Sequence, residues 1–186
     1  MSKDSRPVDI LRTRNLVLDA VTAADTQRVF EYCQDETLQS FVPVPVPYTM
    51  EAATGYTRSY ALDARWLWAI RERVDGPLLG VIELKPHELA SAELGFWLGS
   101  EHRGRGIMTE AAIAVVEYAF TVAGLEHVDW CAVVGNVPSA IVARNAGLRY
   151  EGLRRKSMPH RAVRLDGWFA SILRTDDRSP QGSWPV

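Results

Sequence analysis

Cysteine is scarce in this 186-residue chain, which has only Cys33 and Cys131, far apart from each other. Neither belongs to a C-x-x-C pair or has the spacing of metal ligands, so we expect reduced thiols and no bound metal. Long hydrophobic runs are absent too. The opening MSKDSRPVDI does not resemble a signal peptide, and no stretch approaches the ~20 apolar residues of a membrane span. The sequence therefore predicts a cytoplasmic protein that does not enter a membrane.

The chain also has no excess of charge of one sign. Its formal net charge is −2, with 47% hydrophobic and 24% charged residues, which is ordinary for a globular protein. Such a balance gives no general attraction to nucleic acid, so we expect no direct DNA binding. The length suits one domain. We expect this domain to span 11–174, with flexible termini over 1–10 and over 175–186, where the tail TDDRSPQGSWPV is polar.

Hydrophobic periodicity and turn residues predict a mixed α/β domain whose central sheet has six to seven strands flanked by helices. Three prolines at alternate positions force residues 41–48 into an extended loop. Strand 92–98, helix 105–122 with its apolar stripe, and strand 128–134 form a parallel βαβ unit by their order and length. The other helices are expected over 25–34, 49–62 and 136–147, and the other strands over 16–21, 66–72, 78–85, 148–153 and 167–173.

The most informative segment is AELGFWLGSEHRGRGIMT at 92–109, where an apolar strand runs into a turn that opens a helix. Gly104 and Gly106 let the main chain turn tightly and approach a ligand without a Cβ in the way. The first N–H groups of the helix have no partner within it and lie at the positive end of its dipole. The segment therefore predicts a phosphate-bearing ligand held mainly by backbone around 103–108.

Other glycine-rich phosphate sites fit poorly. A nucleotide P-loop needs Lys and Ser or Thr after its last glycine, whereas Ile107 and Met108 follow here. A dinucleotide fingerprint needs a third glycine where Thr109 stands. A helix start without a ligand is the alternative that this segment alone leaves open.

Two separated motifs resemble those of the GNAT superfamily of acyl-CoA-dependent N-acetyltransferases, in its RimJ/RimL branch. They are ELGFWL at 93–98 with HRGRGIMTEA at 102–111, and NVPSAIVARNAGLRYEG at 136–152. The superfamily pattern Gln/Arg-x-x-Gly-x-Gly/Ala places its small residues on Gly104 and Gly106. Its first position falls on Glu101, which departs from the pattern, so we expect main-chain N–H groups rather than that side chain to hold the pyrophosphate.

The resemblance implies a single-domain GNAT fold in which strands 92–98 and 128–134 splay apart to admit the pantetheine arm of acetyl-CoA. In that arrangement the backbone of 96–98 pairs with the arm like an added strand. Either Arg144 or Asn145 approaches the adenine or its phosphates. The full set implied to bind acetyl-CoA is Phe96, Trp97, Leu98, Arg103, Gly104, Arg105, Gly106, Ile107, Met108, Thr109, Asn136, Ser139 and Arg144.

Acetyl transfer from a thioester to an amine needs a base, because amines with pKa values of about 8 to 10 are mostly protonated at pH 7. The candidates for this base are Glu93, Glu83 and His87, of which we favour Glu93. His87 follows a proline in a loop and is expected at the surface. Ser139 matches the N-x-x-S element of the family and would hydrogen-bond the departing sulfur. The N–H of Trp97 or Leu98 would stabilise charge on the thioester oxygen.

The expected reaction is transfer of acetyl directly onto a primary amine, either a protein N-terminus, including a ribosomal one, or a small amine. The alternative is a non-catalytic acyl-CoA-binding or sensing module of the same fold. A homodimer is also expected, since dimers are common in the family. The segment 149–164 is strongly basic, which fits a solvated hairpin, an anionic acceptor or adjacent ribosomal RNA. Its basic residues are Arg149, Arg154, Arg155, Lys156, His160, Arg161 and Arg164.

Overall fold

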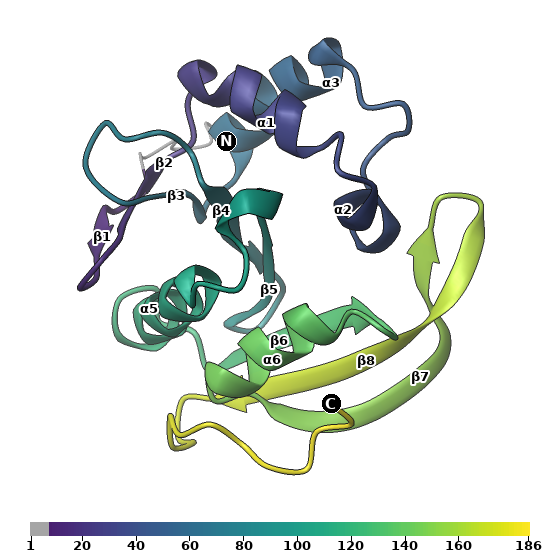
Figure 1. Ribbon diagram of the computed structural model, residues 1–186. Coiled ribbons are helices and arrows are strands. Elements are labelled where there is room, and N and C mark those ends of the chain that lie inside the picture. Colours follow the sequence, from purple (N-terminus) through teal and green to yellow (C-terminus); the bar gives the residue numbers. More distant parts are fainter. Residues whose placement is uncertain (1–7) are drawn as a thin grey trace.

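A single eight-stranded sheet organises the computed structural model, which describes residues 8–186 (Figure 1). The strand order is β1-β2-β3-β4-β5-β6-β8-β7. The sheet has one strand more than the upper end of the predicted range, because a two-residue strand pairs at its edge. The strands are β1 (Leu11–Arg12), β2 (Val17–Ala20), β3 (Leu67–Arg71), β4 (Gly80–Pro86), β5 (Ser91–Leu98), β6 (His127–Val133), β7 (Arg149–His160) and β8 (Val163–Leu173).

All neighbouring strands are antiparallel except β5 and β6, which are parallel, as the predicted βαβ unit requires. Their pairing covers only Ser91, Ala92 and Glu93 of β5, opposite His127, Val128 and Asp129 of β6. Beyond these residues the two strands diverge (Figure 1), as the family resemblance implies. The sheet is therefore continuous at one end of this strand pair and open at the other.

Helices cover both faces of the sheet and enclose two hydrophobic cores. On one face α5 (Ile107–Thr121) and α6 (Val137–Asn145) pack on the strands, and α5 buries the predicted stripe from Met108 to Phe120. On the other face lie α1 (Thr26–Tyr32), α2 (Glu36–Phe41) and α3 (Met50–Gly55). No helix among residues 8–186 is both long and apolar enough to cross a membrane.

Local sequence signals account for the helix starts. Thr49 accepts a hydrogen bond from the Ala52 N–H and caps α3, which continues through a π-helical turn, η2 (Tyr56–Tyr60), into α4 (Ala61–Asp63). The predicted helix over 49–62 is thus confirmed. The remaining short 3-10 helices are η1 (Ala23–Asp25) and η3 (Ser100–His102).

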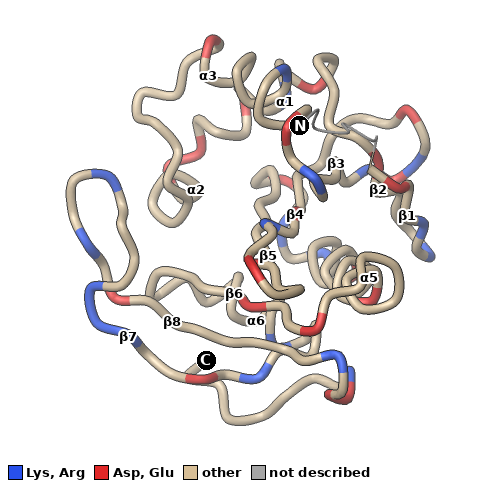
Figure 2. The backbone as a smooth tube through the Cα atoms, turned by 180° about the vertical axis from the view of Figure 1, so that it is seen from behind, with Lys and Arg blue, Asp and Glu red and all other residues tan. Residues whose placement is uncertain are grey.

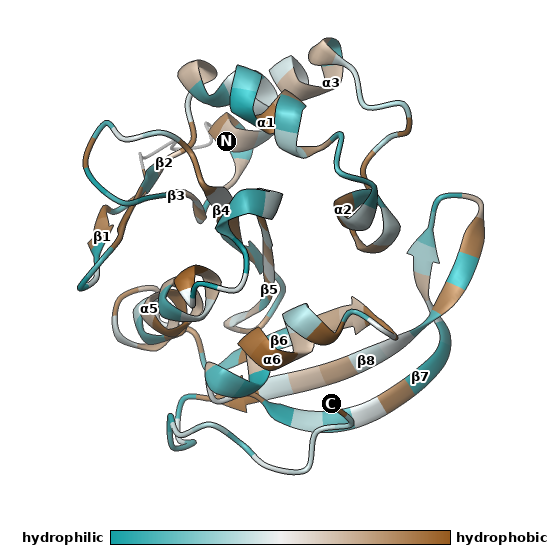
Figure 3. Cartoon of the chain, in the orientation of Figure 1, coloured by the Kyte–Doolittle hydropathy of each residue, from teal (hydrophilic) through white to brown (hydrophobic). Residues whose placement is uncertain are grey.

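Two regular segments differ from the predictions. The sequence predicts no helix at 36–41, yet Asp35 caps α2 there by accepting from the Leu38 N–H, and Phe41 ends that helix instead of opening a loop. The strands expected over 148–153 and 167–173 extend further into a long hairpin, in which β7 reaches His160 and β8 begins at Val163. Most residues over 154–164 are exposed, so this part of the sequence lacks the apolar alternation from which strands are predicted. Figure 3 shows the mixed hydropathy of this hairpin.

The tail over 175–186 contains no helix or strand, but it contacts the domain. The Trp184 ring lies 5.6 Å from the ring centres of Trp130 and of Tyr150, and the carbonyl oxygen of Val186 accepts a hydrogen bond from Arg144. Of the predicted flexible N-terminus, residues 1–7 lie outside the described part of the chain.

A buried charge network ties β2 and β3 to the start of α1. The Arg71 guanidinium donates to both carboxylate oxygens of Asp25, at 2.8 and 2.9 Å, to Asp19 at 2.7 Å and to the Gly76 carbonyl at 3.0 Å. The side chains of Arg71 and Asp25 are only 8% and 6% exposed. Without Arg71 the buried Asp25 carboxylate would keep only the neutral Thr22 N–H and hydroxyl as partners, with no opposite charge.

We expect Arg71→Ala to lower the free energy of unfolding by about 3–5 kcal/mol, because it strands the Asp25 carboxylate in the interior. Urea denaturation monitored by tryptophan fluorescence measures this. The exposed neighbour Arg73 is the control, and Arg73→Ala should change the free energy by less than about 0.5 kcal/mol. Equal effects of the two substitutions would contradict the assignment.

Candidate active site

The turn before α5 presents a row of free main-chain donors. Gly104 and Gly106 have φ values of +73° and +76°, and Gly106 is the N-cap of α5. The first intrahelical bond there is from the Glu110 N–H to the Gly106 carbonyl at 3.0 Å. Within the described chain, no group accepts a hydrogen bond from the N–H groups of residues 104–109. Free N–H groups at the positive end of a helix dipole are suited to bind an anion.

The edge of β5 that faces the divergence carries a second set of free backbone groups. The Leu84 N–H donates to the Trp66 carbonyl, so the even-numbered residues of β4 bond β3 and the odd-numbered ones bond β5. The register pairs Trp97 with Val81, so the Trp97 N–H belongs to that ladder. The N–H and C=O groups of Phe96 and Leu98 point instead into the opening between β5 and β6.

A cavity of about 450 Å³ joins these two sets of donors. Its walls come from α2, from the end of β5, from the turn before α5 and from α6. It is lined by Thr37, Leu38, Phe41, Val42, Phe96, Trp97, Leu98, His102, Arg103, Gly104, Gly106, Ile107, Met108, Thr109, Asn136, Pro138, Ser139, Ile141, Val142 and Asn145. Eleven of the predicted acetyl-CoA residues are therefore brought together in one place, from segments far apart in the sequence.

The start of α6 brings Ser139 and Asn136 to the opposite side of this cavity. Asn136 is the N-cap of the helix, and its side-chain oxygen accepts from the Ser139 N–H at 3.4 Å. The Ser139 hydroxyl accepts a hydrogen bond from the Trp130 indole at 3.2 Å, so its own proton is left to donate toward the cavity.

Two predicted ligand residues do not line the cavity. Arg105 points to the outside of the turn and pairs with Glu72 at 2.9 Å. Arg144 extends along the outer side of α6 to the Val186 carbonyl at 3.2 Å, while its neighbour Asn145 lines the cavity. A helix turns by about 100° per residue, so Arg144 and Asn145 point in different directions.

Arg103 lines the cavity but is held by the protein itself. Its guanidinium donates to the Leu98 carbonyl at 3.1 and 3.2 Å and pairs with Asp35, the N-cap of α2, at 3.2 Å. Arg103 thereby fixes α2 against the end of β5. The Leu98 carbonyl already accepts from Arg103, whereas the Leu98 N–H has no acceptor in the described chain.

Neither predicted base lines the cavity; both lie on the sheet face opposite α5. Glu83 accepts from the Tyr60 hydroxyl at 2.5 Å and pairs with Lys85 at 3.2 Å, and its side chain is 15% exposed. A Cβ placed on Gly95 would lie 3.2 Å from a Glu83 carboxylate oxygen, so this carboxylate covers the strand next to Trp97. Glu93 lies two residues further along β5 from Trp97 than Gly95 does. Its Oε1 is 3.7 Å from Lys85 Nζ, and its Oε2 is 3.6 Å from the Cys131 sulfur.

Comparison with known proteins identifies the family. Residues 15–149 match the family model described as the acetyltransferase (GNAT) domain. The chain belongs to the GNAT family of acetyltransferases. This confirms the resemblance, the fold and the acyltransferase class predicted from the sequence. It also rules out a nucleotide-binding protein of another fold.

The relatives of this GNAT chain include the protein named "Probable N-acetyltransferase YjcK" from Bacillus subtilis (strain 168). It is 32% identical over 137 residues, which are 70% of this chain and 76% of that protein. A GNAT-family acetyltransferase from Bacillus anthracis has a TM-score of 0.82 at 22% identity, covering 90% of this chain and all of that one (100%). RimJ from Mycobacterium smegmatis, solved in complex with CoA-disulfide, has a TM-score of 0.72 at 22% identity, covering 91% and 88%.

One wall of the cavity was not predicted from the sequence. It is formed by Leu38 and Phe41 of α2 and by Val42, which follows that helix. The helix is too short to carry a clear periodic pattern, although Asp35 is a capping residue. His102, next to the glycine motif, also lines the cavity and was not among the residues predicted to bind acetyl-CoA. Its ring bonds the Tyr32 hydroxyl at 2.9 Å.

The two thiols should be nearly inert in the folded protein. Burial raises the pKa of Cys33 to about 11 and, together with the Glu93 charge, that of Cys131 to about 12. At pH 8 about one molecule in 1,000 would then carry a thiolate at Cys33, and fewer at Cys131.

We expect a disulfide reagent to react at least about 100-fold more slowly with the native protein than with the urea-unfolded protein. Absorbance of the released aromatic thiol measures the rates. Cys131→Ser should leave the slow native rate unchanged, and a native thiol that reacts at the unfolded rate would contradict the burial argument.

Proposed function

We propose that this N-acetyltransferase uses acetyl-CoA to acetylate a primary amine. The supporting observation is the continuity between the six free N–H groups of residues 104–109 and the unpaired backbone edge at Phe96 and Leu98 through one cavity. The first group suits a diphosphate, and the second suits the amides of a pantetheine arm. The phosphate end and the reacting end of the donor would thus lie at opposite ends of this cavity.

The reacting end is served by groups from the end of β5 and from the start of α6. The Leu98 N–H, free of the β4 ladder, donates to the thioester oxygen as negative charge develops there. The Ser139 hydroxyl donates a hydrogen bond to the departing sulfur while it accepts one from the Trp130 indole. Trp97, the other predicted donor, lines the cavity, but its N–H belongs to the ladder with β4.

Glu83 rather than Glu93 takes the amine proton, through one water molecule. Glu83 covers Gly95, one two-residue step of about 6.6 Å from Trp97, and Glu93 lies a further step away. Because Gly95 has no side chain, the space between Glu83 and the cavity is not filled by that residue. Burial and the Glu83 charge raise the pKa of Tyr60, which therefore keeps its proton and orients the carboxylate.

The acceptor enters between α2 and the β7–β8 hairpin. Arg161 at the hairpin tip donates to the Gln39 carbonyl of α2 at 2.8 Å, which connects the two walls. Several basic groups of the hairpin have partners within the protein: Arg154 lies 4.0 Å over the Phe169 ring, and Arg164 bonds the Lys156 carbonyl. Figure 2 shows the blue positions along this arm. We infer a solvated hairpin rather than an RNA site, and a cationic amine drawn to the carboxylates beneath it.

Acetyl-CoA should raise the melting temperature of the dialysed protein, and free thiol should appear when a suitable amine is added. The panel is N-terminal peptides of ribosomal proteins, polyamines and aminoglycosides, with thiol release followed by a disulfide reagent. Stabilisation without thiol release across the panel would favour the non-catalytic acyl-CoA-binding module. No stabilisation at millimolar acetyl-CoA would overturn the proposal.

Gly106→Ala should raise the KM for acetyl-CoA about tenfold, since a Cβ is strained at φ +76° and the N–H groups would turn away from the phosphates. Gly124, beyond the other end of α5, is a matched control with φ +72° and equally open surroundings. Both alanine substitutions should cost about 1–2 kcal/mol of stability, but only Gly106→Ala should change KM. Equal KM values for the two variants would contradict phosphate binding at this turn.

Glu83→Gln should lower kcat by about 100-fold or more with little change in the KM for acetyl-CoA, because it removes the base but leaves the binding cavity intact. Glu93→Gln should lower kcat by less than about tenfold. Steady-state kinetics of both variants with the best acceptor decide between them. The opposite ranking would assign the base to Glu93, as the sequence analysis favours.

A further inference from the structure

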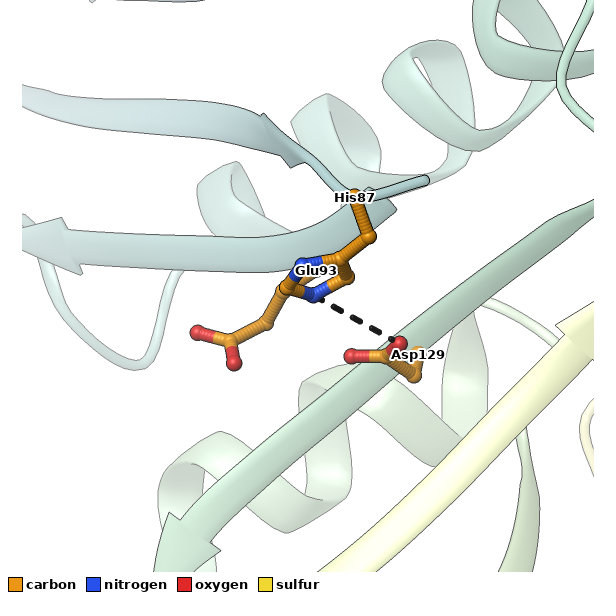
Figure 4. Close-up of side chains that lie close together, drawn as sticks. All are labelled: His87, Glu93 and Asp129. Carbon is orange, nitrogen blue, oxygen red and sulfur yellow. Dashed lines mark ion pairs between the residues drawn. The ribbon is translucent and has the colours of Figure 1, made fainter. Parts of the chain in front are cut away.

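We propose that His87, Glu93 and Asp129 form a binding site for one divalent transition-metal ion, with Zn²⁺ as the ion to test. One ligand atom from each residue lies within 4.8 Å of the other two. Figure 4 shows the three side chains, which come from the end of β4, from β5 and from β6, with His87 and Asp129 directed toward each other. This site is separate from the acetyl-transfer cavity and goes beyond the proposed function.

The backbone fixes the positions of these residues before any ion binds. Glu93 and Asp129 are Cα partners in the short parallel ladder, so their side chains emerge side by side on one face. The His87 N–H donates to the Ser91 carbonyl at 2.8 Å, which closes the β4–β5 turn beneath the imidazole. The cluster is therefore built at the paired end of β5 and β6.

The side chains can close on an ion without movement of the backbone. Ligand atoms around a tetrahedral Zn²⁺ at about 2.0–2.1 Å lie roughly 3.4 Å apart, so the present separations must shorten by up to about 1.5 Å. The side chains of His87, Glu93 and Asp129 are 49%, 29% and 33% exposed, which leaves room for such rotations.

The Asp129 carboxylate is the least satisfied member of the cluster. Its Oδ2 lies 3.8 Å from His87 Nε2 and 3.8 Å from His127 Nδ1, too far for a hydrogen bond, and no described group donates one to it. A half-buried carboxylate between two imidazoles suits a cation, and His127 or water can supply the fourth ligand.

Other neighbours set limits on the affinity. Lys85 Nζ lies 3.7 Å from Glu93 and competes with a cation for that carboxylate. The Cys131 sulfur lies 3.6 Å from Glu93 and would bind metal only after losing its proton. A mixed set of imidazole and carboxylate favours Zn²⁺ over Mg²⁺ or Ca²⁺, which prefer oxygen alone.

The test is isothermal titration of the full chain, stripped with a chelator, with Zn²⁺ and with Mg²⁺. We expect one Zn²⁺ per chain, no comparable Mg²⁺ binding, and a Kd for Zn²⁺ at least about tenfold higher in His87→Ala and in Asp129→Asn. Glu117→Gln, which changes an exposed carboxylate on α5, should bind as the parent does. At free Zn²⁺ of 100 times the Kd, the melting temperature should rise by about 5–10 °C.

Absence of saturable Zn²⁺ binding, or equal affinity in the parent and in both cluster variants, would overturn the proposal. His87 lies half-exposed in a turn, so His87→Ala carries the test even if Asp129→Asn does not fold. Visible absorption of bound Co²⁺ provides a second measurement, since the bands expected of a four-coordinate site should disappear in His87→Ala. Their persistence would place the ion elsewhere on the chain.

Discussion

Two parallel strands that pair over only three residues determine the geometry around them. β5 and β6 are joined from Ser91 to Glu93 and then separate, yet each stays rigid because β4 and β8 pair with their outer edges. A fixed opening in a sheet exposes backbone donors and acceptors that a ligand must satisfy. The helices that follow these strands, α5 and α6, both begin at this open end, so their N-termini face the same space.

The opening separates two kinds of electrostatic environment. On the α5 side the free N–H groups and the helix dipole favour negative charge. On the opposite face, carboxylates at Glu83, Glu93 and Asp129 favour positive charge. Under the proposed function, a polyanionic donor and a cationic amine would be drawn to different sides of one sheet and would meet only where the strands diverge. This arrangement would keep a protonated amine away from the phosphates.

The local parts of the fold and of the site could be predicted from the sequence, whereas the long-range parts could not. The glycines at 104 and 106, the apolar stripe of α5 and the capping Asn136 are local signals, and the structure places all of them as predicted. The direction of Arg144 depends on the tail that it meets at Val186, and the role of α2 depends on Arg103 and Asp35. Which of Glu83 and Glu93 lies nearer to the cavity depends on the register of β4 against β5, which one sequence does not encode locally.

The segment 175–186 supports the cavity from outside. Trp184 packs on Trp130, and the Trp130 indole bonds the Ser139 hydroxyl, so a single aromatic ring separates this segment from a residue of the cavity wall. A substitution of Trp184, or removal of the segment, would disturb that ring and with it the serine. Variants made to study the cavity should therefore keep residues 175–186.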